Sequence, residues 1–390
     1  MRWSPLGSAG KMIHCIGHWE TWNWLVKYIP ILPAWAWFCI RSGTPWFFTP
    51  SNPGLTFGGF DGENKKEMYD LLPAGTYPAT RYVASQSPVS ALEEYFSSGE
   101  FTFPVAVKPA IGRMGLMFRK HESMRDLRHY HAVMQVDYLL QQFVDYPLEV
   151  SIFYYRLPDQ PTGAITGFVK KEYLTVKGDG RSTLWELILN YPRASFRLQE
   201  MRLRHAAHLD RIITEGEGYT LSHALNLSRG GKLISLAREK DERLVKVIDD
   251  ISQHGGFYFG RYDIKCNSIE DLKNGRNYSI LEFNGSGAEP HHVYGNGNTL
   301  TQALGILLWH WHILFRISMT NHQRGIPFWN FGQGLRHMIK TQKHFKLLKK
   351  LENGETMEPA YRDTSRTGES NKILERATAL RTPVSTHGPQ

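Results

Sequence analysis

The chain has 390 residues, of which 41% are hydrophobic and 21% charged, a globular composition that excludes a disordered or collagen-like protein. Its length favours two or three domains, or one domain built of lobes. The formal net charge of +9 demands no nucleic-acid partner, because residues 336–390 hold 11 Lys and Arg against 6 Asp and Glu, and no DNA- or RNA-binding motif is present. Cys15, Cys39 and Cys266 lie far apart, which excludes a disulfide scaffold and a CxxC zinc site, so we expect a reducing, cytoplasmic location.

A Trp-rich stretch at residues 22–40 is the first unusual feature. It has nearly the length of a membrane-spanning helix, but Asn23 and Lys27 are polar, and Pro30 and Pro33 interrupt its middle. Three interpretations stay open: a buried packing segment, a peripheral membrane contact, which Trp and Tyr favour, and a transmembrane helix. A signal peptide is disfavoured, because a clean apolar core is missing.

Residues 47–73 are rich in Gly, Pro and Asn, so we expect turns and loops there, with one short helix ended by Pro73. Gly58 and Gly59 are interpreted as turn glycines rather than phosphate ligands. Residues 1–70 are therefore set apart as an atypical N-terminal region.

The body of the chain alternates between strand and helix patterns, which predicts an α+β fold. The expected strands are 103–108, 115–119, two halves within 139–156, a pair within 165–176, 257–265 and 277–284. The expected helices are 122–133, 183–190, 196–209, 242–254 with Gly255 as its C-cap, and 299–317. Residues 336–390 are predicted to form a basic helix and then a mobile polar tail.

Two strands that carry carboxylates hold the clearest chemical signal. Arg261, Asp263 and Lys265 alternate onto one face of the first strand, and Glu282 and Asn284 share a face of the second. The connection between the strands is short and turn-rich, so the strands could pair and bring Asp263 near Glu282. Oxygen ligands without Cys or His suit Mg²⁺ or Mn²⁺. The alternative is that these are ordinary polar residues at strand ends.

Lysines and amides on the other strands add weaker signals. Lys108 ends an apolar strand before a loop that contains Gly112 and Gly115, which suits a phosphate cradle although it is not a Walker A sequence. Lys170 and Lys171 lie on a later strand, where either could reach a phosphate or simply face solvent.

A hinge-like break between two strand halves supplies a third group. Gln141 and Gln142 precede the break and could hydrogen-bond an adenine base. Glu149 follows it and could bind ribose hydroxyls.

Taken in order, these motifs resemble the ATP-grasp superfamily, in particular the ATP-grasp module of cyanophycin synthetases and the D-alanine–D-alanine ligases. The resemblance covers about residues 70–315. The motifs that carry it are VKPAIGRMG (107–115), LLQQFVDYPLEVS (139–151), KKEYLTVKGDGRSTLWELI (170–188), LNLSRGGK (225–232), GRYDIK (260–265) and LEFNGSG (281–287).

The resemblance implies two α+β lobes that sandwich ATP, within an ATP-grasp domain at residues 71–335. The nucleotide lobe would span about 71–160 and the metal-binding lobe about 161–335. Residues 1–60 do not look like the N-terminal α/β domain that related ligases carry. The segment 285–297, with His291, His292 and Tyr294, stands where their substrate loop would be.

The resemblance also implies a role for each matched residue. Phosphates would be bound by Lys108, by the Gly112–Gly115 loop, and by Lys170 or Lys171. Gln141 would contact adenine, Gln142 and Phe143 would offer backbone contacts at the hinge, and Glu149 would bind ribose. Asp263, Glu282 and Asn284 would hold Mg²⁺ or Mn²⁺, and Arg229 and Arg261 would steady a transferred phosphoryl group.

The resemblance favours an ATP-dependent carboxylate–amine ligase that works through an acylphosphate. Its partners would be ATP and a small-molecule or peptide carboxylate with an amine. One alternative is an ATP-grasp kinase of a small molecule. Another is a non-catalytic, membrane-associated ATP-binding protein, which the 22–40 segment would suit.

Overall fold

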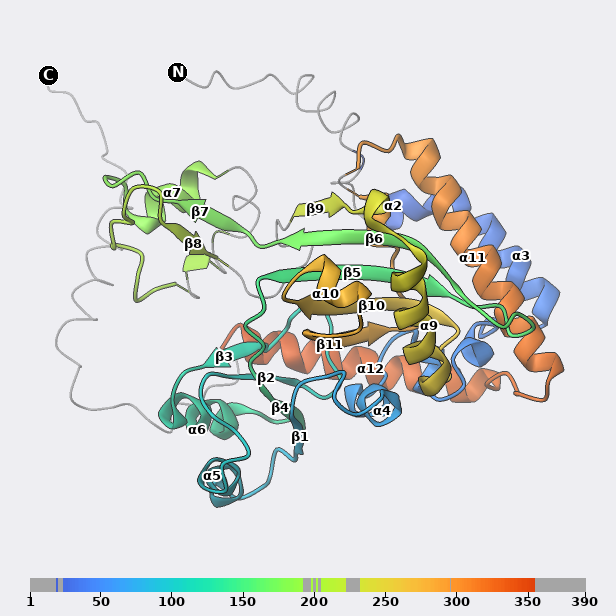
Figure 1. Ribbon diagram of the computed structural model, residues 1–390. Coiled ribbons are helices and arrows are strands. Elements are labelled where there is room, and N and C mark those ends of the chain that lie inside the picture. The colour runs from blue at the N-terminus through green and yellow to red at the C-terminus, as the bar shows by residue number, and fades with distance from the viewer. Residues whose placement is uncertain are drawn as a thin grey trace, which may run out of the picture.

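The chain folds into two antiparallel sheets that face each other, each with helices packed on it (Figure 1). The computed structural model describes Trp19, residues 24–191, Leu198, 201–202, 205–221, 232–294 and 296–354. The predicted α+β arrangement in two lobes is therefore confirmed. Most of the predicted helix 196–209 and the polar tail lie outside the described residues.

The smaller sheet has the strand order β1-β4-β2-β3, with every pair antiparallel. Its strands are β1 (Thr80–Val83), β2 (Val105–Pro109), β3 (Arg119–His121) and β4 (Tyr138–Gln142). Two helices pack on it, α5 (Val89–Ser97) and α6 (Met124–Val133), through buried Leu92 and Leu127. The last helix, α12 (Phe331–Glu352), adds Phe345 and Leu348 to the same core, so a distant segment completes this lobe.

The larger sheet has the order β11-β10-β5-β6-β9, again antiparallel throughout. Its strands are β5 (Leu148–Tyr155), β6 (Ala164–Glu172), β9 (Lys232–Ser235), β10 (Phe259–Cys266) and β11 (Tyr278–Asn284). The chain thus changes sheet between Gln142 and Leu148, and the lobe boundary near residue 160 stays a prediction.

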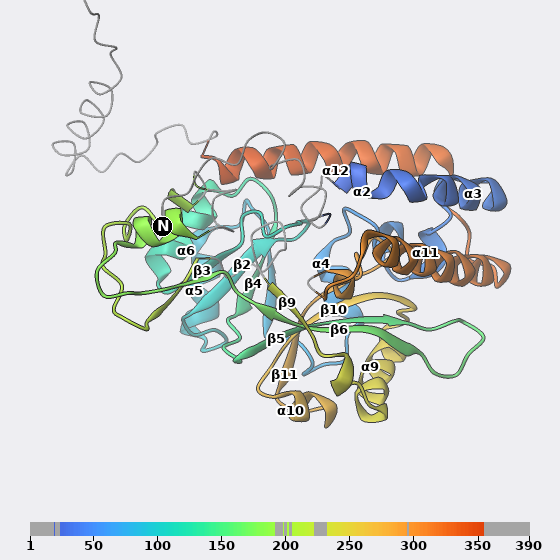
Figure 2. The ribbon, with the colours of Figure 1, turned by 90° about the horizontal axis from the view of Figure 1, so that it is seen from above.

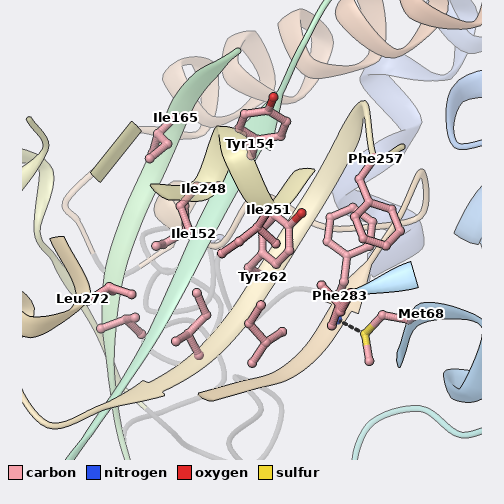
Figure 3. Close-up of a cluster of buried hydrophobic side chains, with 14 of the residues drawn as sticks. Met68, Ile152, Tyr154, Ile165, Ile248, Ile251, Phe257, Tyr262, Leu272 and Phe283 are labelled. Carbon is pink, nitrogen blue, oxygen red and sulfur yellow. Dashed lines mark hydrogen bonds between the residues drawn. The ribbon is translucent and has the colours of Figure 1, made fainter. Parts of the chain in front are cut away.

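Helices cover both faces of the larger sheet, so apolar side chains that point to either face are buried. Ile152 and Tyr154 of β5 pack with Ile248 and Ile251 of α9 (Glu242–Gly255) in the core shown in Figure 3. Phe153, on the opposite face, packs in the cluster that includes buried residues of α11 (Leu300–Gln323). The predicted C-cap shifts by one residue, because Gly256 and not Gly255 adopts the left-handed conformation.

The Trp-rich segment forms α2 (Trp24–Tyr28), the 3-10 turn η2 (Ile29–Ile31) and α3 (Leu32–Ser42). These helices pack on α11, where Trp35 meets Trp311 at a ring separation of 4.9 Å and Phe38 stacks on Phe315 at 4.8 Å. The packing interpretation of this segment is thus confirmed for one of its faces. In the described part of the chain, no helix combines the length and apolar character needed to cross a bilayer.

The Gly-rich N-terminal loop lies against the end of β11. It contains η3 (Thr49–Ser51) and η4 (Thr56–Gly59) and leads into α4 (Lys65–Leu71). Gly58 and Gly59 have positive φ angles, so they are turn glycines as expected. The amides of Ser286 and Gly287 donate to their carbonyls at 3.1 Å, which joins residues 58–59 to the chain after β11.

The remaining elements correct two predictions. A small sheet of β7 (Thr175–Lys177) and β8 (Gly218–Thr220) packs with α7 (Leu184–Asn190), and short turns η7 (Ala237–Glu239) and η8 (His291–Val293) occur elsewhere. The strand predicted at 115–119 is wrong, since Met114, Gly115 and Met117 have positive φ angles and β3 begins only at Arg119. The connection predicted as a turn between β10 and β11 contains α10 (Ile269–Lys273), capped by Ser268.

Candidate functional site

The two carboxylate-bearing strands lie side by side in the larger sheet. β10 and β11 pair antiparallel, with Asp263 directly opposite Glu282 and Arg261 opposite Asn284. All four side chains therefore project from the same face of the sheet. A break in register after Asp263 separates this end of the pair from Lys265.

Asp263 is buried between two cationic side chains. Lys171 Nζ lies 2.9 Å from its Oδ1, and Arg261 Nε lies 3.3 Å from the same atom. Burial opposes ionisation, but the guanidinium of Arg261 and the ammonium of Lys171 outweigh it, so the pKa of Asp263 falls below its ordinary value. Asp263 is thus held as a carboxylate.

Lys171 links Asp263 on β10 to Glu149 on β5, the residue predicted to bind ribose. Its Nζ also donates to Glu149 Oε1 at 3.2 Å, and Tyr173 donates to the other oxygen of Glu149. The neighbouring Lys170 points elsewhere, to the half-exposed Glu172 at 3.2 Å. Of the two candidate lysines, only Lys171 contacts Glu149 and Asp263. We call the group formed by these three residues and the neighbouring Arg261, Glu282, Lys65 and Lys108 the charged cluster.

Lys108 crosses from the smaller lobe to the larger one. Its Nζ donates to Tyr69 Oη at 2.9 Å and to the carbonyl of Leu281 at 3.0 Å, one residue before Glu282. Burial, reinforced by the nearby charge of Lys65, lowers the pKa of Lys108 to about 7. Lys108 therefore lies at the interface of the two sheets. A pKa of about 7 means that both its amine and its ammonium form are populated near neutral pH.

Lys65 is a site residue that the sequence did not reveal. It begins α4 and forms an ion pair with Glu282, across 217 residues of chain. Burial disfavours its charge, but Glu282 outweighs this and raises the pKa of Lys65; the pKa of Glu282 is lowered correspondingly. The KKEMYDL helix carries no local pattern that marks this lysine, because its partner is set by tertiary packing.

Glu63 is a second residue that the sequence did not reveal. Its Oε2 atom is buried and makes no hydrogen bond within the described part of the chain. Burial raises the pKa of Glu63 to about 7 in spite of nearby Lys65, and the charge of Glu282 adds to the rise. Asn284 Nδ2 and Ser286 Oγ are likewise buried without hydrogen-bond partners among the described residues.

The predicted adenine and hinge residues lie at the end of β4, between β1 and β2, where they hydrogen-bond neighbouring segments. Gln141 Nε2 donates to Thr80 Oγ1 at 2.7 Å. Gln142 Nε2 donates to the carbonyls of Thr102 and Pro104, and the amide of Phe143 donates to Pro104 at 3.3 Å. These hydrogen bonds fix the position of the chain before the connection to β5, and adenine binding by these residues stays a prediction.

The glycine loop follows β2 as expected. Gly115 has a positive φ of 67°, whereas a Cβ at Gly112 would meet only ordinary contacts. Within the loop Arg113 pairs with Asp61 at 3.3 Å, which ties the loop to the N-terminal region. Phosphate binding by the loop stays a prediction.

The remaining candidate residues are two arginines, Arg229 and Arg261, and two histidines, His291 and His292. Arg229 lies outside the described residues, and Arg261 donates to the carbonyl of Glu289 at 2.9 Å as well as to Asp263. His291 is beside the cluster, where its Nδ1 lies 3.1 Å from Ser151 Oγ, and burial lowers its pKa far below the ordinary value. His292 packs near His310, at a ring separation of 5.3 Å.

The donor atoms suit a magnesium ion by chemistry. Asp263, Glu282 and Asn284 present oxygens from adjacent strands, as a hard cation requires. Both carboxylates are already matched by cations, Asp263 by Lys171 and Arg261, and Glu282 by Lys65. In the described residues, no group of three His, Cys, Asp or Glu side chains is arranged to hold a metal ion. Magnesium binding by Asp263, Glu282 and Asn284 stays a prediction.

Comparison of the sequence with known families and curated proteins finds no match, whereas comparison of the structure with solved structures finds distant similarities. No family model and no curated protein matches the chain. A bifunctional glutathione synthetase from Pasteurella multocida is 14% identical, with a TM-score of 0.34 over 64% of this chain and 36% of that one. A D-alanine–D-alanine ligase from Bacillus anthracis is 12% identical, with a TM-score of 0.39 over 67% of this chain and 69% of that one.

A third solved structure is the ATP-grasp ligase PsnB with a minimal precursor. It is 14% identical, with a TM-score of 0.35 over 64% of this chain and 59% of that one. The chain thus spans less than two thirds of the glutathione synthetase and of PsnB. PsnB belongs to the superfamily that the sequence motifs resemble. Each of these three TM-scores is below 0.4, so the likenesses do not assign a function to this chain.

Proposed function

We propose that the chain is an ATP-dependent carboxylate–amine ligase that works through an acylphosphate. One observation carries the proposal: the predicted phosphate lysines and the predicted metal carboxylates meet in one cluster between the sheets. Lys108 reaches Leu281 beside Glu282, and Lys171 contacts Asp263 and Glu149. Five buried or half-buried charged groups, Lys108, Glu149, Lys171, Asp263 and Glu282, converge there from five strands. Burying charges costs stability, so their convergence favours a functional role.

Charge decides the role of each residue in the proposal. Lys108 and Lys171 supply positive charge for nucleotide phosphates, and Arg261 steadies the phosphoryl group as it moves. Asp263, Glu282 and Asn284 would hold Mg²⁺, which would supply positive charge to neutralise the phosphates. No residue has to become a covalent nucleophile, because positioning and charge neutralisation account for phosphoryl transfer.

The carboxylate substrate attacks the γ-phosphorus of ATP and releases ADP. The amine then attacks the acyl carbon and expels phosphate, and the leaving phosphate keeps one oxygen of the original carboxylate. Glu63, with a pKa of about 7 and a buried oxygen that has no hydrogen-bond partner among the described residues, is suited to accept the proton that the amine loses.

The test uses the purified full-length chain with ATP, Mg²⁺ and a panel of amino acids and dipeptides, one of them labelled with ¹⁸O in its carboxylate. The proposal expects ADP, phosphate and amide in equal amounts, with ¹⁸O in the phosphate. Glu282→Gln should abolish this turnover, and Glu94→Gln, on an exposed site of α5, should not. A stable phosphorylated product formed without amine would identify a kinase instead. ATP binding without turnover on any pair would favour the non-catalytic alternative.

A further inference from the structure

The outer face of α2 and α3 is apolar and exposed. Trp35 and Phe38 pack inward on α11, but residues on the other side of the same helices point to solvent. Ile40 is 72% exposed and Trp37 is 58% exposed. The large apolar side chains that α2, η2 and α3 leave exposed are Val26, Ile29, Leu32, Trp37 and Ile40. Single exposed apolar residues are ordinary, whereas five on one short segment mark an interaction surface.

The exposed side of α12 is apolar near its start and basic further on. Phe331 is 63% exposed and Ile339 is 50% exposed, while Phe345 and Leu348 face the core. The exposed apolar residues of α12 are Phe331, Leu335, Met338 and Ile339. Its exposed basic residues are Arg336, Lys340, Lys343, Lys346, Lys349 and Lys350. A shallow hollow lined by Arg336, Ile339, Lys340 and Lys343 shows that both kinds share one surface.

These two surfaces belong to one side of the molecule. Trp46, just after α3, stacks on Phe331 at a ring separation of 6.2 Å and donates from Nε1 to the Phe331 carbonyl at 3.3 Å. In Figure 2, α2, α3 and α12 run along the same side of the sheets, and Figure 1 shows that α2 and α3 lie at a different height from α12. We name this side the docking face, defined by the exposed apolar residues of α2–α3 and α12 and the exposed basic residues of α12.

The charge of the docking face is of one sign. Residues 24–50 contain Lys27 and Arg41 and no acidic residue. The single acidic residue of α12 is Glu352, which pairs with Arg119. The exposed cations of α12 are therefore not neutralised within their own helix.

We propose that the docking face binds the surface of an anionic lipid bilayer. Exposed Trp and aliphatic side chains enter the interfacial region of a bilayer, and lysines and arginines beside them attract anionic headgroups. A second copy of the chain fits this face less well, because a symmetric contact would set like charges against each other. This proposal does not depend on the proposed ligase activity.

The test is co-sedimentation of the full-length chain with vesicles of phosphatidylcholine alone or with 30% phosphatidylserine. Sedimentation should need phosphatidylserine and should fall several-fold when NaCl rises from 0.1 to 0.5 M. Ile29→Ser with Ile40→Ser, and separately Lys340→Glu with Lys343→Glu, should each reduce the bound fraction at least five-fold. All four positions are exposed, and circular dichroism and the melting temperature of each variant verify that it folds.

Matched controls lie away from the docking face. Leu189→Ser, at an exposed leucine of α7, and Lys246→Glu, at an exposed lysine of α9, should leave binding unchanged. The proposal is overturned if the chain ignores both vesicles, binds both equally, or loses binding as much in the controls. A concentration-dependent dimer that Ile29→Ser with Ile40→Ser abolishes, without lipid binding, would assign the face to a second copy instead.

Discussion

At the scale of single residues, the charged cluster is organised by ion pairs within the larger sheet and by contacts that reach it from α4 and from the smaller sheet. Lys171 has a side chain only 3% exposed, and it serves two carboxylates, Glu149 and Asp263. Lys65, on α4, forms an ion pair with Glu282. Lys108, on the smaller lobe, donates to the carbonyl of Leu281, the residue before Glu282. Each pair binds charges that would be costly to bury alone, so the cluster acts as a unit.

Lys171→Met should destabilise the fold, because it leaves Glu149 and Asp263 buried without their shared cation. We expect a loss of about 3–5 kcal/mol in the free energy of unfolding, measured by urea denaturation. Lys170→Met, one residue earlier and half-exposed, should change it by less than about 1 kcal/mol. Equal effects from the two substitutions would mean that Lys171 does not hold the cluster together.

Lys108→Met should weaken ATP binding by about ten-fold or more, since a charge-assisted phosphate contact contributes roughly 1.5–3 kcal/mol. Because the pKa of Lys108 is about 7 in the free protein, phosphates that favour its ammonium form should draw in a proton on binding near pH 8. Calorimetry in two buffers of different ionisation enthalpy measures this uptake. It should approach one proton in the wild type and vanish in Lys108→Met. Buffer-independent heats in the wild type would remove Lys108 from the phosphate site.

Glu63 should make stability depend on pH. Its folded pKa of about 7 lies above the ordinary 4.5, so the protonated form is favoured by folding, and this stabilisation is lost as pH rises between these values. Glu63→Gln removes the titration, so its stability relative to the wild type should increase from pH 5 to pH 8. Urea unfolding at both pH values measures this, with Glu94→Gln as the exposed control. A relative stability that is the same at both pH values would contradict the raised pKa.

At the scale of elements, the N-terminal loop is joined to the larger sheet by one side chain. Asn52 Nδ2 donates to the carbonyls of Gly58 and Phe259, at 3.1 and 2.9 Å. Its Oδ1 accepts from the amides of Tyr258 and Phe259. Asn52 is fully buried, so it substitutes for a strand partner at the start of β10.

Asn52→Ala should therefore cost about 2–4 kcal/mol of unfolding free energy, since several buried backbone groups would lose their partner. Asn274→Ala, at the exposed C-cap residue of α10, is the matched control and should cost less than about 1 kcal/mol. Chemical denaturation of both variants makes the comparison. A small effect at Asn52 would show that water replaces its hydrogen bonds and that the loop is not anchored there.

At the scale of the whole molecule, α12 connects distant parts of the chain. Near its start, His337 Nε2 lies 2.8 Å from the Asp61 carbonyl in the N-terminal loop. Near its end, Leu348 is fully buried in the core of the smaller lobe. One helix thus packs against the N-terminal loop and completes the smaller lobe, although the basic run alone suggested a separate C-terminal element.

Leu348→Ala should destabilise the protein by about 2–5 kcal/mol through the cavity it leaves. Lys346→Ala, two residues earlier and exposed, should have little effect. Urea unfolding, followed by fluorescence, measures both. If Leu348→Ala behaved like Lys346→Ala, α12 would not be part of the core.

The sequence by itself determined the local structure and the chemical types of the candidate site. Strand alternation located β5, β6, β10 and β11, and the short connection predicted the pairing that sets Asp263 opposite Glu282. Such features depend on neighbours a few residues apart, so they can be read locally. The strand at 115–119 failed because left-handed residues break its pattern, and hydrophobic alternation does not report φ.

Only the tertiary structure decided which charged groups meet. It selected Lys171 over Lys170, brought Lys65 to Glu282, left Glu63 Oε2 buried, and packed α12 on the smaller lobe. The contact between Lys65 and Glu282 joins residues 217 positions apart, and that between Met117 and Glu352 of α12 joins residues 235 positions apart. Their geometry follows from strand register and helix packing. A one-residue change of register reverses the face of every side chain, so no local pattern in the sequence could have specified them.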